Sequence, residues 1–142
     1  MERSTEIEKL IRDFVAAYES GDVAFVERTT SKRPGVVGIG TDADEYARDY
    51  EGIVNSVRAE IGGASPLFRL RIGEVRAYEH GDVGWADGTG YLESNGKSVE
   101  IRNTSVFLRE AGQWRSVQSH SSIGVPNDRM FDPLFQRHTT AP

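Results

Sequence analysis

The sequence contains no cysteine, so disulfide bonds, catalytic thiolates and cysteine-ligated zinc sites are excluded. It also contains no apolar run approaching the ~20 residues that a helix needs to cross a bilayer. The charged N-terminal stretch MERSTEIEKL lacks the apolar segment of a secretory signal. We therefore expect a cytoplasmic protein without a membrane-spanning segment.

Basic residues are too few and too scattered to form a patch. The net charge is −5 at pH 7, and the longest basic run is the pair Lys32 and Arg33. Nucleic acids and anionic membrane surfaces are bound mainly by clustered Lys and Arg. We expect neither partner, which leaves a small molecule or another protein chain.

The length of 142 residues fits one domain with a single core. We place that domain at residues 1–125 and a C-terminal tail at residues 126–142. The tail carries four large apolar residues: Met130, Phe131, Leu134 and Phe135. Because exposed apolar clusters are unfavourable, we expect the tail to pack on its own domain or on a partner subunit.

Helical spacing of apolar residues dominates the first half of the chain. One amphipathic helix is predicted to end at Gly21, and Asp22 is placed to cap a second, shorter one. A short strand is predicted in VVGIGT. Asp42 and Glu45 match a capping box for a third helical segment, which Gly52 interrupts.

From residue 67 the apolar period changes from 3.6 to 2, and four strand-like runs follow. The sequences EHGD, SNGK and EAGQ separate them and are typical of hairpin turns. The apolar parity flips after Gly73, which indicates a β-bulge and a bent sheet. We predict an α+β fold in which a curved antiparallel sheet wraps around the N-terminal helices as a cone, leaving an open end suited to a small molecule.

Two stretches carry a family resemblance: FVAAYESGDVAFVE at the first helix junction and FLREAGQWRSVQSHSS at the last hairpin. Over roughly residues 5 to 124 the chain resembles the SnoaL-like proteins of the nuclear transport factor 2 and ketosteroid isomerase superfamily. The resemblance implies a cystatin-like α+β barrel, a ligand cavity inside it, and a homodimer packed through the sheet. The superfamily includes isomerases, dehydratases, epoxide hydrolases, polyketide cyclases and proteins with no known reaction, so the fold does not name an activity.

The residues that the resemblance would require for steroid isomerisation are absent. Phe14 stands where that enzyme has a helix tyrosine, and Gly38 or Ile39 stands where it has an aspartate base. Thr104 or Ser105 occupies the place of its second acid. Isomerisation by that mechanism is therefore not expected.

His120 is the best catalytic candidate, because it is the only histidine inside a predicted core element and imidazole titrates near neutral pH. Strict strand alternation places it with Ser116 and Gln118 on one face, and Ser119 and Ser121 on the other. Related association domains line their cavities from the position of Ser121, which favours the second face. His120 then lies either in the pocket or on the outer face of the sheet.

The residues that we expect to line the pocket are aromatic or small and polar: Phe14, Tyr18, Tyr46, Tyr50, Trp85, Asn103, Ser105, Ser119 and Ser121. Tyr46 and Tyr50 are predicted to share a helical face near the mouth of the cone. No metal site is expected, because capping explains Asp42, Asp44 and Glu45 more simply, and no cofactor motif is found.

Two functions remain open on the sequence. The chain binds a small molecule in a hydrophobic cavity, with or without a reaction of the isomerase, dehydratase, cyclase or hydrolase type on a small hydrophobic substrate. Alternatively, it is a non-catalytic module whose sheet serves to dimerise.

Overall fold

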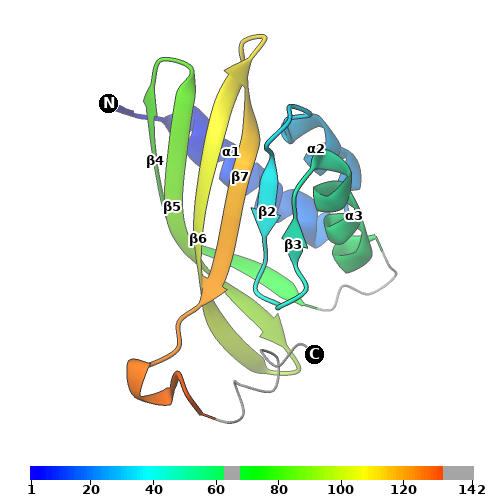
Figure 1. Ribbon diagram of the computed structural model, residues 1–142, viewed down its shortest axis with the longest axis vertical. Helices are drawn as coiled ribbons and strands as arrows, with labels where there is room; N and C mark the ends of the chain where they lie inside the picture. The colour runs from blue at the N-terminus through cyan, green and yellow to red at the C-terminus, as the bar shows by residue number, and fades with distance from the viewer. Residues whose placement is uncertain (63–67, 133–142) are drawn as a thin grey trace.

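The computed structural model describes residues 1–62 and 68–132 and has three α-helices and a seven-stranded sheet in an α+β arrangement (Figure 1). The predicted fold class is confirmed. Leu134 and Phe135 of the C-terminal tail lie outside the described residues, and the short 3-10 helix Asn127–Arg129 precedes them.

The first two helices begin and end close to where their capping residues predict. Helix α1 spans Thr5–Ser20 and ends at Gly21, whose φ of 72° is in the left-handed region that favours glycine. Helix α2 spans Val23–Thr29, and the Asp22 carboxylate accepts a hydrogen bond from the Phe25 amide at 3.1 Å. A tight turn thus connects two helices that pack on the same side of the sheet (Figure 1).

The sequence predicts that Asp42 and Glu45 cap a helix, and this prediction is wrong. Asp42 and Glu45 instead close a turn between strands β2 (Val37–Ile39) and β3 (Tyr46–Ala47), where the Asp42 amide donates to Glu45 Oε2 at 3.0 Å. Helix α3 begins later, at Tyr50–Ile61, and Asp49 caps it. A carboxylate three residues from another fits both motifs, and pairing of β2 with β3 selects the turn.

Four long antiparallel strands form the body of the sheet: β4 (Arg69–His80), β5 (Val83–Ser94), β6 (Lys97–Glu110) and β7 (Gln113–Ile123). Their three hairpins fall where the turn sequences predict. The short strand β1 (Glu2–Arg3) pairs with β4, while β2 runs parallel to β7, which gives the order β1-β4-β5-β6-β7-β2-β3.

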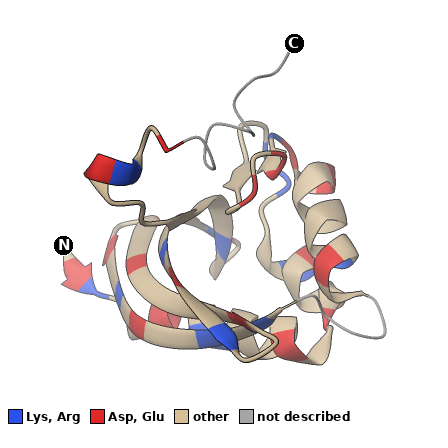
Figure 2. Cartoon of the chain, turned by 90° about the horizontal axis from the view of Figure 1, so that it is seen from below, with Lys and Arg blue, Asp and Glu red and all other residues tan. Residues whose placement is uncertain are grey.

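Two irregularities bend the sheet. The register between β4 and β5 shifts between Ile72 and Val75, which confirms the bulge predicted after Gly73. A second shift, which the sequence did not predict, lies between Val106 and Phe107 of β6 opposite β7. The strands consequently curve around one side of the molecule, and the helices lie opposite them (Figure 2).

The main core lies where α1 crosses the concave face of this sheet. Ile7 of α1 is fully buried against a cluster formed by Ala77, Ala86, Phe107 and Trp114. None of the helices in the described part of the chain is long and apolar enough to cross a membrane. Beyond this core, the space between helices and sheet is only partly filled.

Candidate functional site

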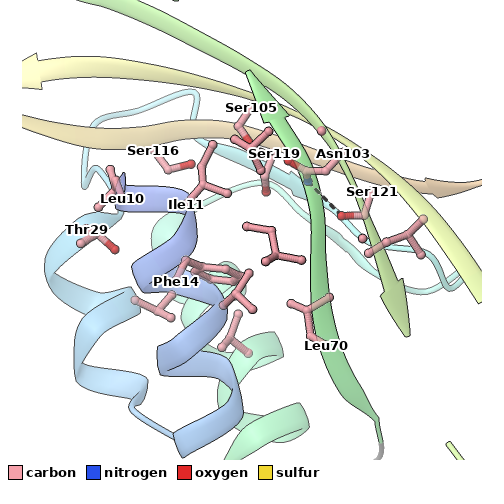
Figure 3. Close-up of a pocket in the computed structure, with 18 of the residues that line it drawn as sticks. Leu10, Ile11, Phe14, Thr29, Leu70, Asn103, Ser105, Ser116, Ser119 and Ser121 are labelled. Atoms are coloured by element: carbon pink, nitrogen blue, oxygen red, sulfur yellow. Dashed lines mark hydrogen bonds between the residues drawn. The ribbon is translucent and has the colours of Figure 1, made fainter. Parts of the chain in front are cut away.

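A cavity of about 210 Å³ lies between the helices and the concave face of the sheet. Its helix side is apolar, with Leu10, Ile11 and Phe14 of α1 pointing into it (Figure 3). Further walls come from Ile53 of α3 and Leu70 of β4. These side chains can enclose the apolar body of a ligand without offering it a charge.

The sheet side of the cavity carries a connected set of small polar groups. Ser105 Oγ donates to Asn103 Oδ1 at 2.9 Å, and Asn103 Nδ2 donates to Ser121 Oγ at 3.0 Å (Figure 3). The amide is thereby fixed in orientation. Because Ser121 Oγ accepts the hydrogen bond from Asn103, the hydroxyl proton of Ser121 remains available to a ligand. Ser116 and Ser119 add two further hydroxyls, and within the described residues neither side chain has a hydrogen-bond partner.

The second bulge decides which residues of β7 face the cavity. Val106 pairs with Gln118 while Phe107 pairs with Ser116, so Val117 is an extra residue in β7. The strict alternation predicted from sequence is therefore wrong along this strand. Ser116 faces the cavity together with Ser119 and Ser121, although strict alternation would put Ser116 on the opposite face from the other two serines.

His120 lies on the outer face of the sheet and is exposed. It pairs in the backbone ladder with Thr104 on one side and Ile39 on the other, and it lines neither this cavity nor its neighbour. Of the two positions that the sequence left open, the structure gives His120 the outer one. It cannot act as an acid or base inside the cone from there.

Three aromatic residues expected in the pocket lie elsewhere. Tyr46 belongs to β3 and is 55% exposed, so it does not share a helical face with Tyr50. The Tyr50 hydroxyl donates to the Glu27 carbonyl oxygen at 3.2 Å. Trp85 stacks on Tyr78 on the outer face, with ring centroids 6.3 Å apart. Tyr46 lies in the β2–β3 hairpin and Tyr50 at the start of α3, so the expected helical face does not form. Trp85 is on the opposite side of β5 from the buried Ala86, and therefore on the outer face.

The remaining six expected residues line the interior. Phe14, Asn103, Ser105, Ser119 and Ser121 surround the main cavity, and Tyr18 joins Phe14 in an adjoining compartment of about 170 Å³. The two spaces share several walls, namely Phe14, Ile53, Val57, Leu70, Ile101, Ser119 and Ser121. They are adjacent parts of the space between the helices and the sheet, and they form its two ends.

The adjoining compartment contains an acid that the sequence analysis missed. Tyr18 Oη donates to Glu60 Oε2 at 2.9 Å, linking α1 to the end of α3. Burial raises the pKa of the Glu60 carboxyl, the hydrogen bond from Tyr18 lowers it, and the nearby Glu45 raises it further. Burial and the Glu60 charge raise the pKa of the Tyr18 hydroxyl, which therefore remains a donor at neutral pH.

The signal for Glu60 was present in the sequence. Ile53, Val57 and Glu60 are spaced four and three residues apart, so they share one face of α3. A lone carboxylate on an otherwise apolar helical stripe is the signal that indicates such a residue.

No group of three or more His, Asp or Glu side chains in residues 1–62 and 68–132 could hold a metal ion. The main cavity is lined by two charged residues, but both side chains are directed to the outer face. Arg71 Nε donates to Glu93 Oε1 at 2.9 Å, and Asp87 Oδ2 accepts from Arg76 at 2.7 Å.

Known structures share this architecture. A nuclear transport factor 2-like protein of unknown function from Pseudomonas putida aligns with a TM-score of 0.76 at 15% identity, covering 87% of this chain and 88% of that one. A protein with a cystatin-like fold from Caulobacter vibrioides gives 0.71 at 16% identity, covering 92% and 96%. A nuclear transport factor 2-like superfamily protein from Salmonella enterica gives 0.70 at 17% identity, covering 86% and 91%. At these identities the likeness shows the fold alone.

Among curated proteins, none is significantly similar in sequence. The sequence pattern of the SnoaL-like domain, in contrast, matches residues 7–126, which include all of α1 but its first two residues, the other two helices and the four long strands. The match covers most of the chain. This chain belongs to the SnoaL-like domain family.

Proposed function

We propose that this protein binds a small, predominantly apolar molecule in the space between α1, α3 and the concave face of the sheet. The observation that carries the proposal is the composition of the main cavity. Its helix side is apolar, and its sheet side offers the aligned Ser105–Asn103–Ser121 hydrogen bonds. Pockets of this kind hold a ligand by apolar contact and orient it with a few fixed polar groups.

The size of the interior agrees with a ligand of one ring and a short chain. An apolar cavity of roughly 150 Å³ already holds benzene in a protein core. The main cavity here is about 210 Å³ and shares walls with a second compartment of about 170 Å³. The hydroxyl of Ser121 is available to donate to an oxygen of such a ligand, since its own oxygen accepts from Asn103.

Binding without a reaction is favoured over acid–base catalysis in the main cavity. The charged residues of its wall, Arg71 and Asp87, pair with partners on the outer face. A general acid or base must reach the ligand within hydrogen-bond distance. The described walls of the main cavity provide hydroxyl and amide groups but no titratable side chain directed inward.

Two neighbouring residues of β7 allow a matched test. Ser119 faces the cavity and His120 the outer face, so a phenylalanine at each position adds similar bulk on opposite sides of the sheet. With 4-phenylbutan-1-ol as probe, we expect Ser119→Phe to weaken binding at least tenfold and His120→Phe to change it less than twofold. Isothermal titration calorimetry measures both, and circular dichroism checks the fold. Equal loss in both variants, or an undetectable affinity in the unmodified protein, contradicts the proposal.

We also propose that the outer face of the sheet forms a homodimer. In the described part of the chain, no helix covers this face (Figure 1). The stacked Tyr78 and Trp85 lie on it beside Val106, which pairs with Trp85. Aromatic residues are enriched in protein interfaces, and Thr104 and Gln118 add neutral polar groups to this face. The ion pair of Arg76 with Asp87 lies beside Tyr78 and Trp85 on the same face.

A further inference from the structure

The two ends of the interior differ in charge. The main cavity presents only neutral side chains inward, whereas the adjoining compartment contains Glu60 and Glu45. No Lys, Arg or His of the described residues lines the adjoining compartment. A ligand that occupies both ends therefore meets apolar and hydroxyl groups at one end and a carboxylate at the other.

Glu60 is incompletely partnered for a half-buried acid. Tyr18 donates to Oε2, but no donor among the described residues reaches Oε1, and no described cation forms an ion pair with this carboxylate. Most other acids near the helices are paired: Glu27, for example, accepts from Arg58 at 2.8 Å. A carboxylate taken partly out of water without a counter-ion is costly, and a ligand that supplies one would relieve that cost.

We propose that the compartment at Glu60 receives the ammonium group of an amine whose apolar part extends past Phe14 into the main cavity. This inference rests on the proposed ligand-binding function and names the class of ligand. The ammonium would donate to Glu60 Oε1, the acceptor that Tyr18 leaves open. Phe14 and Tyr18, whose ring centroids are 6.4 Å apart, both line this compartment, and aromatic rings attract a cation rather than an anion to their faces.

The electrostatics of the compartment discriminate between ligand classes. Burial and the charge of Glu45 both raise the pKa of Glu60, because both disfavour its ionised form. A bound ammonium group would favour the ionised form. A ligand carboxylate would place a further negative charge beside Glu60, so it is expected to bind poorly.

Three probes with the same apolar body separate the contributions: 4-phenylbutylamine, 4-phenylbutan-1-ol and 4-phenylbutyrate. At about pH 8 the amine is still protonated, since alkylammonium groups have a pKa of about 10. Calorimetric titration of the unmodified protein is expected to give an amine affinity at least tenfold above that of the carboxylate, with the alcohol between them. Equal affinities for amine and carboxylate would overturn the proposal.

The matched variants are Glu60→Gln and Glu51→Gln, which remove the same charge from the same helix. Glu51 is exposed at the start of α3 and lies outside both compartments. We expect Glu60→Gln to weaken the amine about tenfold and to leave the alcohol unchanged, and Glu51→Gln to affect neither. An equal loss of amine affinity in both variants would show a non-specific effect of net charge and would overturn the proposal.

The design separates this proposal from the ligand-binding function on which it rests. If the alcohol binds but the amine gains nothing from Glu60, only the charge assignment fails. If none of the three probes binds, both proposals fail. Should Glu60→Gln not fold, the unmodified protein still decides: amine affinity must fall as the pH is lowered and Glu60 is protonated, whereas alcohol affinity must not.

Discussion

The Glu60 carboxyl, near the end of α3, accepts its one described hydrogen bond from Tyr18 of α1. Burial opposes its ionisation, and the hydrogen bond favours it. The net effect is a raised pKa, so the folded protein binds a proton at Glu60 more tightly than the unfolded chain does. The stability of the protein must then depend on pH through this residue.

The sign of that dependence gives a prediction at the residue scale. Between the unfolded pKa of glutamate, about 4.3, and the raised folded value, the native state binds more protons than the unfolded state. The contribution of Glu60 to the free energy of unfolding therefore falls as the pH rises through this interval. Glu60→Gln removes this loss, because glutamine does not titrate and its oxygen can still accept from Tyr18.

Urea unfolding of both proteins at several pH values measures the difference directly. The advantage of Glu60→Gln over the unmodified protein is expected to grow from about pH 4 upward and then to level off. A difference that stays constant or shrinks with rising pH contradicts the raised pKa of Glu60.

Single residues also show why part of the site could not be read from the sequence. Phe14, Tyr18 and the serines were placed by periodicity and by resemblance, and they do line the interior. His120 was ambiguous because alternation along the last strand separates two faces without showing which of them is concave. The bulge at Val117, which no glycine or proline indicates, additionally changes the side on which Ser116 lies. The place of Glu60 in the site is not evident from the sequence, because only the packing of α1 against α3 brings its carboxylate to Tyr18 and into an interior compartment.

At the scale of elements, local signals predicted more than long-range ones did. The hairpin after β5 turns at Asn95 and Gly96, and the one after β6 turns at Ala111 and Gly112, all with positive φ. Such turns depend on four neighbouring residues. The pairing of β2 with β7, in contrast, joins segments about 80 positions apart, and only tertiary structure reveals it.

The bend in β4 and β5 requires a close approach at Gly88. A Cβ there would lie 2.6 Å from the Glu74 carbonyl oxygen, a backbone atom next to the bulge. We expect Gly88→Ala to destabilise the protein by about 1–3 kcal/mol, because the two strands must separate to accept the methyl group. Chemical denaturation measures the change.

Gly124 provides the matched control for this substitution. A Cβ there would meet nothing closer than 3.7 Å, and its φ is outside the left-handed region. Gly124→Ala is expected to be neutral or slightly stabilising, since it reduces the freedom of the unfolded chain. Equal stabilities for the two variants would show that the bend does not depend on the space at Gly88.

At the scale of the whole molecule, the concave face of the sheet encloses the interior and the outer face is available to a second copy. If the outer face forms the homodimer, a charge at Trp85 should disrupt it, because burying an unpaired carboxylate in an interface is unfavourable. Sedimentation velocity is expected to show a dimer for the unmodified protein and a monomer for Trp85→Glu.

Tyr46→Glu serves as the control for the dimer. Tyr46 is an exposed aromatic residue on β3, at the far end of the strand order from β4. This variant should remain dimeric. A monomeric unmodified protein, or a dimer that Trp85→Glu leaves intact, contradicts the assignment of the outer face.

The central claim is that the hollow between the helices and the bent sheet is a ligand site. A crystal structure of the protein with 4-phenylbutan-1-ol tests it most directly. The account predicts electron density for the phenyl ring against Leu10, Ile11 and Phe14, with the hydroxyl group in the same enclosed interior. An interior that excludes the probe at saturating concentration, or a probe bound only on the outer face of the sheet, would contradict it.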